Sequence, residues 1–111
     1  LISGNNIVLD CQGYSLRDTL RDTNYKGIEI TTTGTGITVK NCNIKDYGNG
    51  IFVSGRDILL EQNIIENAQY GILCKDWVNK GNFGRNTRIK GNIFKDTPNP
   101  LNWDCVGLTE E

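Results

Sequence analysis

The sequence predicts an all-β fold in which short strands stack in parallel as a solenoid of about four rungs. Three observations lead to this prediction: a composition rich in strand and turn residues, a repeat of about 21 residues, and an alternation of apolar and polar residues within each repeat. A chain of 111 residues is long enough for one small domain, and residues 1–111 are expected to form it.

The composition favours strands and turns over helices. The chain has 13 Ile, 14 Asn and 13 Gly, but one Ala and no Met. Its 12 basic and 13 acidic residues give a formal charge of −1, which offers no electrostatic basis for binding nucleic acid. No apolar run approaches the ~18 residues of a membrane span. We therefore expect no nucleic-acid partner and no membrane span.

The repeat is visible as three segments that align without gaps, residues 37–46, 58–67 and 87–96. The interval between the starts of the last two segments is longer by eight than that between the first two, so the third rung carries an insertion of this length. This insertion falls near residues 75–86, and a similar excursion of the first rung falls near residues 17–26. Both are polar stretches suited to surface loops.

Apolar and polar residues alternate within each copy, as at Ile28 and Ile30 or at Ile37 and Val39, which is typical of a short half-buried strand. Such strands cannot bury their apolar faces singly. Equivalent strands are therefore expected to stack in parallel about 4.8 Å apart. The aligned residues then form interior columns: Ile44 with Ile65 and Phe94, Ile37 with Ile58, and Val39 with Leu60 and Ile89.

Asn and Asp recur where each rung is expected to turn. Asn63 and Asn92 share one column, and Asp46, Asn67 and Asp96 share another. Stacked Asn side chains can hydrogen-bond to neighbouring rungs, and Asn tolerates the left-handed backbone of a sharp corner. We interpret both columns as structural. In the alternative, Asp46 and Asp96 form a catalytic pair, but they lie two rungs apart, and ~9–10 Å is marginal for acid–base chemistry.

The four cysteines, Cys11, Cys42, Cys74 and Cys105, lie at nearly equal intervals along the chain. No close pair typical of a metal finger is present, and adjacent rungs bring Cα atoms within the ~4.4–6.8 Å that a disulfide requires. The sequence thus predicts disulfides Cys11–Cys42 and Cys74–Cys105, with four buried free thiols as the alternative. Disulfides imply an oxidising location, extracellular or at the cell surface, with the periplasm as a further case. The first residues lack Met, as expected after removal of a leader or a longer part.

The repeat resembles that of a known family. The pattern Ile-x-Asn-Asn-x-Ile-x-Asn followed by Gly-Ile is similar to the repeat of right-handed parallel β-helix proteins, which include pectate-lyase-like enzymes, polysaccharide hydrolases and epimerases. Residues 4–16 resemble the first rung of a periplasmic β-helix protein that assists copper-centre maturation of nitrous-oxide reductase. The resemblance implies a short right-handed parallel β-helix. It selects no activity, because one β-helix hosts many.

The enzymes of this family use Asp clusters with calcium and an Arg base, or three Asp with a Gly-His-Gly segment and an Arg-Ile-Lys tripeptide. Residues 88–90 match the tripeptide, but the chain has no His, and an ordinary strand with Ile89 inward explains the match. Copper would recruit His, Met or reduced Cys, and His and Met are both missing. We predict no catalytic residue, no metal site and no cofactor, and the balance is against an enzyme.

Five residues are candidates for contact with carbohydrate. Trp77 and Trp103 follow the third strand of consecutive rungs, and Tyr70, Asp76 and Asp104 lie close to them in the stack. Exposed aromatic rings beside carboxylates commonly bind sugar faces and hydroxyls. The alternative is that both Trp side chains cover the insertion loop or the end of the core.

The ends of the solenoid favour a structural function. Open sheet edges need caps, and residues 1–4 and the segment 98–100 with Trp103 are the candidates, since Pro is a poor strand partner. Where caps fail, copies stack end to end into an open filament. The sequence therefore predicts a non-catalytic extracellular module that is structural or self-assembling, as in a fibre or sheath, with itself as partner. The alternative is a carbohydrate-binding module or a fragment of a polysaccharide-active β-helix enzyme.

Overall fold

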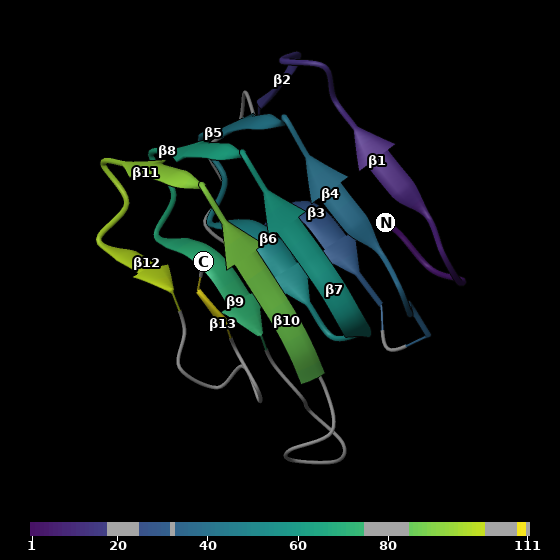
Figure 1. Ribbon diagram of the computed structural model, residues 1–111. Helices are drawn as coiled ribbons and strands as arrows, with labels where there is room; N and C mark the ends of the chain where they lie inside the picture. Colours follow the sequence, from purple (N-terminus) through teal and green to yellow (C-terminus); the bar gives the residue numbers. More distant parts are fainter. Residues whose placement is uncertain (18–24, 32, 75–84, 102–108, 111) are drawn as a thin grey trace.

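A computed structural model describes residues 1–17, 25–31, 33–74, 85–101 and 109–110 of the chain. These residues form thirteen short strands and no helix (Figure 1). The strands are β1 (Val8–Asp10), β2 (Ser15–Arg17), β3 (Lys26–Ile30), β4 (Thr38–Lys40), β5 (Asn43–Lys45), β6 (Asn49–Val53), β7 (Arg56–Glu61), β8 (Ile64–Glu66), β9 (Tyr70–Cys74), β10 (Arg85–Lys90), β11 (Ile93–Lys95), β12 (Asn99–Leu101) and β13 (Thr109–Glu110).

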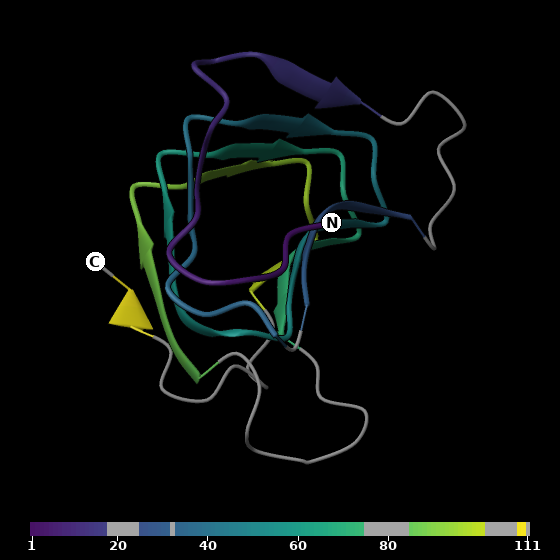
Figure 2. The same cartoon turned by 90° about the vertical axis from the view of Figure 1, so that its right-hand side faces the viewer.

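The strands form three parallel sheets, because each turn of the chain adds one strand to each sheet. The first sheet has the order β1-β4-β7-β10-β13, the second β2-β5-β8-β11 and the third β3-β6-β9-β12. Figure 2 shows the rungs overlaid around one common interior. Four complete rungs therefore stack in register, and β13 adds a further strand beside β10. The predicted all-β solenoid of four rungs is confirmed.

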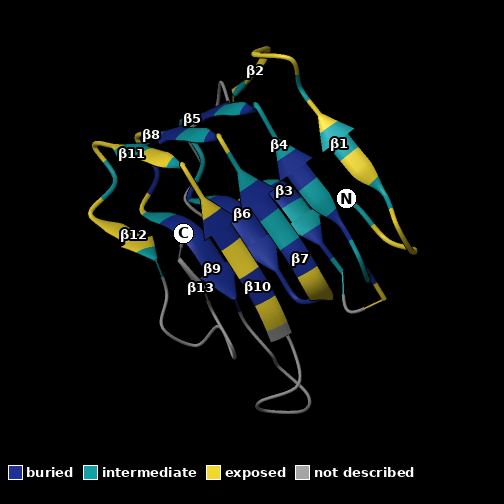
Figure 3. Ribbon diagram, viewed as in Figure 1, coloured by how far each residue is buried: buried dark blue, intermediate teal, exposed yellow. Residues whose placement is uncertain are grey.

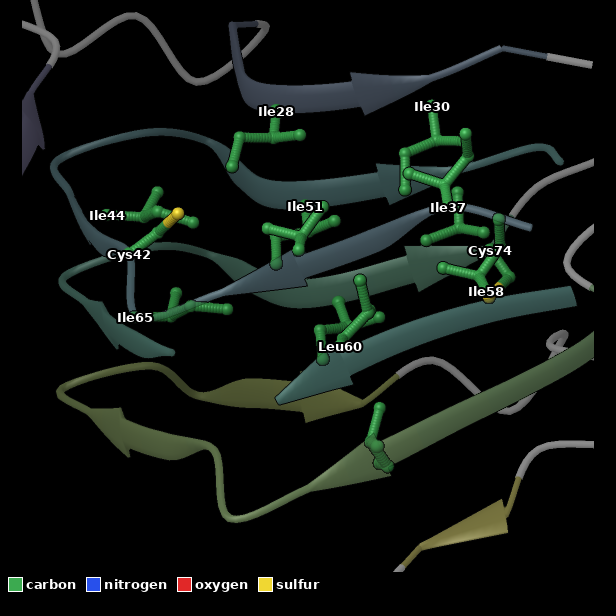
Figure 4. Close-up of a cluster of buried hydrophobic side chains, with 14 of the residues drawn as sticks. Ile28, Ile30, Ile37, Cys42, Ile44, Ile51, Ile58, Leu60, Ile65 and Cys74 are labelled. Carbon is green, nitrogen blue, oxygen red and sulfur yellow. The ribbon is translucent and has the colours of Figure 1, made fainter. Parts of the chain in front are cut away.

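The interior is filled by the predicted apolar columns (Figure 4). In the second sheet Ile44 pairs in register with Ile65, which pairs with Phe94, and the Ile44 and Ile65 side chains are fully buried. The first sheet contributes one buried column of this kind, and the third sheet contributes two. The columns of these two sheets are Val39, Leu60 and Ile89; Ile28, Ile51 and Ile72; and Ile30, Val53 and Cys74.

Burial is not uniform along the stack (Figure 3). The second and third rungs carry most of the buried side chains, whereas the first and last rungs expose apolar ones. Val8 on β1 is 61% exposed and Ile93 on β11 is 50% exposed. The terminal rungs are less buried because most of their strands lie at the edge of a sheet, with a partner strand on one side alone.

Residues with a left-handed backbone gather in three columns at the corners of the rungs. The predicted left-handed backbone is confirmed at the corner between the second and third sheets, where φ is 65° at Asp46, 54° at Asn67 and 49° at Asp96. At the corner between the first and second sheets, the predicted hydrogen bonds of Asn63 and Asn92 to the neighbouring rung are confirmed, but their predicted left-handed backbone is wrong. The left-handed residues there are Gln62 and Gly91, each one position before the predicted Asn, together with Asn41 at the same position of the second rung. The reason is that Asn63 and Asn92 turn their side chains toward the inside of the stack.

Strands occupy the first and last residues of the predicted insertions near residues 17–26 and 75–86. Arg17 already ends β2 and Lys26 opens β3, while β10 begins at Arg85, in register with Arg56 of β7. Pairing with the neighbouring rung extends these strands into polar sequence. Residues 18–24 and 75–84 lie outside the described part of the chain.

Of the two predicted disulfides, Cys11–Cys42 is confirmed, with the two Cα atoms 4.8 Å apart. It joins the first rung to the second at the corner that follows the first sheet. Cys74 is fully buried at the end of β9 and is not a free thiol. Cys105 lies outside the described residues, so the pairing Cys74–Cys105 stays a prediction.

Candidate functional site

The predicted carbohydrate contacts lie mostly outside the residues that the structure describes. Asp76, Trp77, Trp103 and Asp104 all fall in undescribed segments. Tyr70 opens β9 and is half-buried, in register with an Asn of the rung on either side. The structure therefore places one of the five residues, and their grouping stays a prediction.

The tripeptide 88–90 lies on β10 and has the pattern of an ordinary strand. Ile89 is 2% exposed and packs in the core, while Arg88 and Lys90 are exposed. The two basic side chains therefore project from the outer face of the first sheet, as the sequence predicts.

The carboxylates at the corners accept hydrogen bonds from neighbouring rungs. Asp46 accepts a hydrogen bond of 2.8 Å from Asn67 and an ion-paired one of 2.7 Å from Arg17. Asp10 accepts from the backbone N–H of Gln12 at 2.9 Å and from the side chain of Asn41 at 3.1 Å. These bonds, the backbone one above all, hold the pKa of Asp10 below its usual value. Asp10 and Asp46 thus join neighbouring rungs.

A hollow of about 300 Å³ lies at the corner between the second and third sheets. Its walls carry one aromatic side chain, Tyr47, beside the corner carboxylates and amides. The residues that line it are Asp46, Tyr47, Gly48, Asn67, Ala68, Gln69, Asp96 and Pro98. The described residues contain no group of three His, Cys, Asp or Glu side chains placed to hold a metal ion.

A ladder of asparagine side chains, here called the Asn ladder, joins the rungs inside the opposite corner. Asn63 is fully buried; its Oδ1 accepts from the backbone N–H of Cys42 at 3.1 Å and its Nδ2 donates to the carbonyl of Val39 at 3.1 Å. Asn92 makes the same two bonds in the next rung. Its Oδ1 accepts from the backbone N–H of Asn63 at 3.0 Å, and its Nδ2 donates to the carbonyl of Leu60 at 2.8 Å. Each Asn therefore bonds to the rung before it.

This polarity leaves the two ends of the Asn ladder different. At its start, Cys42 occupies the ladder position and is tied to Cys11 by the disulfide instead of by an amide. At its other end, the backbone N–H of Asn92 finds no acceptor among the described residues.

A glycine column governs how closely the strands of the third sheet approach. A Cβ atom at Gly27 would lie 2.7 Å from the carbonyl oxygen of Gly50, and one at Gly50 would lie 2.7 Å from that of Gly71. A Cβ atom at Gly71 would lie 2.5 Å from the carbonyl oxygen of Pro100, which takes the glycine position in the last rung. A further strand in the same register would therefore bring its carbonyl oxygen against the Pro100 ring.

Pro100 thus disfavours a further strand in the same register of the third sheet. The predicted cap of segment 98–100 with Trp103 stays a prediction, because Trp103 lies outside the described residues. The predicted cap at residues 1–4 behaves differently. Ile2 pairs in parallel with Ile30, donating to the carbonyl of Glu29 at 2.7 Å and accepting from the N–H of Thr31 at 2.9 Å. This segment extends the sheet beside β3. The recurrence of Gly27, Gly50 and Gly71 is visible in the repeat, but sequence reasoning missed that Pro100 takes the next position, although Gly71 and Pro100 are separated by the same interval as the last two repeats.

The disulfide bears on the location of the protein. A Cys11–Cys42 disulfide is typical of an oxidising, non-cytoplasmic compartment. Within the part of the chain that the structure describes, no helix has the length and apolar character needed to cross a membrane.

Comparison with known proteins identifies the fold family. The model of a family described as the right-handed β-helix region matches residues 26–102. A search of curated proteins and a search of solved structures each find no match. The match covers more than half of the chain and agrees with the three stacked parallel sheets. The chain belongs to the family of right-handed β-helix proteins.

Proposed function

We propose that the chain is a non-catalytic structural module, extracellular or on the cell surface, that joins further β-helical rungs at its C-terminal end. End-to-end stacking of identical copies into a fibre or sheath is the simplest form. The observation that carries this proposal is the open Asn ladder: Asn92 bonds backwards to the third rung, and its own N–H has no acceptor among the described residues.

The exposure of the last rung supports the same proposal. Ile65, in the third rung, is fully buried, whereas Phe94, at the next position of the same interior column, is half-buried. A following rung would bury the remaining face of Phe94 and part of Ile93. Burial of apolar surface contributes about 25 cal/mol per Å², so contact with the exposed part of Phe94 would stabilise an added rung.

The use of the corner carboxylates supports a non-catalytic function. General acid–base chemistry needs carboxylates that are available to a substrate. The carboxylates in question instead accept hydrogen bonds that join one rung to the next: Asp10 from Asn41, Asp46 from Asn67, and Asp57 from Asn86.

The test is the mass distribution of the purified chain under non-reducing conditions, measured by light scattering at several concentrations, with negative-stain microscopy of the same samples. We expect the mean mass to rise with concentration and filaments one β-helix wide to appear. Ile93→Glu should reduce the association, because it places a charge at the exposed last rung. The matched control is Asn43→Glu, which adds the same charge to the same outer column away from either end.

A monomer at every concentration would exclude stacking of identical copies. Joining to another chain would then be the remaining form of the proposal. A monomer that also binds no β-strand of another chain would overturn the proposed function altogether.

We also propose carbohydrate contact as a second candidate function, because the hollow beside Tyr47 combines an aromatic ring with carboxylates and amides. Retention on a polysaccharide array tests it. Loss of retention in Trp77→Ala, Trp103→Ala and Tyr70→Ala variants would support the predicted site, and loss in Tyr47→Ala alone would move the contact to the hollow. Cleavage of pectin-like, alginate-like or host glycans by the chain would contradict the non-catalytic proposal.

A further inference from the structure

We propose that a hollow at the corner between the first and second sheets, here called the amide hollow, binds a short segment of neutral carbohydrate. Its volume is about 350 Å³, and its lining includes Gln12, Gly13, Asn41, Asn43, Gln62 and Ile64. Ligand pockets of proteins commonly have volumes of ~300–1,000 Å³, so the amide hollow is large enough for a small ligand. The inference goes beyond the proposed function, because the amide hollow lies away from the C-terminal end of the stack and from the hollow beside Tyr47.

The first rung forms one wall of the amide hollow by means of a longer corner. This corner has two residues more than the corner of the second rung. The N–H of Tyr14 donates to the carbonyl of Cys11 at 2.9 Å, which closes a β-turn. The two central residues of the turn, Gln12 and Gly13, have left-handed φ values of 52° and 85°. The N–H of Gly13 donates to the carbonyl of Asn41 at 2.8 Å, so the turn is held against the second rung.

The other walls of the amide hollow come from the second and third rungs. Asn43 opens β5 in the second rung, and Ile64 opens β8 in register with it in the third. Gln62 lies at the corner just before β8. In the fourth rung, Gly91 has no side chain at this position, and a Cβ atom there would lie 3.7 Å from Cγ of Gln62. The column of amide side chains at this corner therefore ends with Gln62, and the hollow lies along the side of the first three rungs.

The side-chain amides of Gln12, Asn43 and Gln62 are available to a ligand. Among the described residues, none of these three side chains has a hydrogen-bond partner. By contrast, Asn67 and Asn86, at the other corners, each donate to a carboxylate of the rung before. An amide offers both N–H donors and a carbonyl acceptor, and a hydroxyl group likewise both donates and accepts. A ligand rich in hydroxyl groups therefore suits the three side chains.

The lining of the amide hollow also favours a ligand without charge. None of the described residues that line it is charged, whereas Asp46 and Asp96 line the hollow beside Tyr47. A charged group would lose hydration in the amide hollow and find no opposite charge there. Its apolar surface is Ile64, which is half-buried, and Ile93, the next residue of this outer column, is 50% exposed. The C–H face of a sugar ring can cover this apolar surface while its hydroxyl groups reach the amides.

The test is an NMR titration of the intact labelled chain that follows the side-chain amide signals of Asn and Gln. The probes are the neutral disaccharides maltose, cellobiose and diacetylchitobiose, with digalacturonic acid as the charged counterpart. We expect at least one neutral disaccharide to cause saturable shifts of the Gln12, Asn43 and Gln62 side-chain signals, and digalacturonic acid to bind more weakly. Gln62 is exposed, so Gln62→Glu leaves the core unchanged. It should weaken binding about fivefold, the effect of one lost hydrogen bond.

Gln69→Glu provides the matched control, because it makes the same change at an exposed residue of the same rung that lines the hollow beside Tyr47. This variant should keep the affinity of the unchanged chain. Weaker binding by Gln69→Glu with no effect of Gln62→Glu would overturn the inference and favour the hollow beside Tyr47. No saturable shift at about 10 mM of any neutral disaccharide, or tighter binding of digalacturonic acid, would also overturn it. The proposed stacking is tested separately, by the mass distribution of the chain.

Discussion

The two ends of the stack are built differently at the same corner. At the start, the first rung is joined to the second by the Cys11–Cys42 disulfide, and Cys42 occupies the position that Asn takes in later rungs. At the other end, Asn92 bonds backwards, and its N–H is open as far as the described residues extend. The first two rungs are therefore held together at this corner by a covalent bond, while the later rungs are held together there by a repeating hydrogen-bond pattern.

Breaking the Asn ladder in its middle should have the largest effect. Asn63→Ala removes the acceptor of the Cys42 N–H and the donor to the Val39 carbonyl, and both groups lie inside the stack. Leaving buried polar groups unpaired costs roughly 1–3 kcal/mol each, so we expect a loss of about 4 kcal/mol in the free energy of unfolding. Urea unfolding followed by circular dichroism measures it.

The matched control is Asn67→Ala at the exposed corner. It removes one hydrogen bond, to Asp46, from a residue in contact with solvent and places Ala at the left-handed φ of 54°, so it should cost about 2 kcal/mol in all. Equal losses for Asn63→Ala and Asn67→Ala would show that the ladder contributes no more than an ordinary corner.

Removing the Cys11–Cys42 disulfide should have the next largest effect on stability. The Cys11–Cys42 disulfide closes a loop with a sequence separation of 31, and the chain-entropy model assigns such a loop about 3.7 kcal/mol. The Cys11→Ser variant should therefore unfold at a lower urea concentration. In native-state hydrogen exchange, the amides of β4 should lose more protection than those of β7, because release of the first rung uncovers β4 first. Uniform loss of protection would contradict a role confined to that end.

The glycine column should produce a smaller but specific effect. At Gly50 a Cβ atom would lie 2.7 Å both from the carbonyl oxygen of Gly71 and from the Ile65 side chain. Gly50→Ala should therefore force neighbouring rungs apart and cost about 2 kcal/mol. Gly13→Ala is the control: nothing lies within 4 Å of its Cβ position, and its φ of +85° leaves only backbone strain, about 1 kcal/mol. Thermal unfolding of both variants separates crowding from strain.

The interior of the fold was predictable because the repeat itself sets the register. The aligned copies place Ile44 with Ile65 and Phe94, and strand pairing then makes these residues neighbours. The spacing of Cys11 and Cys42 predicted a disulfide for the same reason. An alignment of the repeats shows which residues stack, and this is almost enough to predict the core.

The corners and ends were harder to predict, because a repeat alignment does not show which way a side chain turns. Asn63 was expected to carry the left-handed backbone, but Gln62 carries it and frees the Asn side chain to enter the stack. The function of Pro100 depends on the distance between backbones at the glycine column, which composition does not reveal. The predicted carbohydrate contacts fall mostly in segments without the repeat, where no register constrains them.

Lowering the pH should have the smallest effect on stability, and this effect concerns the first rung. The carboxylate of Asp10 accepts hydrogen bonds from the Gln12 N–H and from Asn41, which lower its pKa in the folded chain below the ~3.9 of the unfolded one. The unfolded state then binds the proton more readily, so this stabilisation is complete above about pH 4 and is lost as the pH falls through the folded pKa. Asp10→Asn should remove that part of the pH dependence. We expect the stability difference between wild type and variant to shrink from pH 6 to pH 2, and a constant difference would show that the charge of Asp10 does not help to hold the first rung.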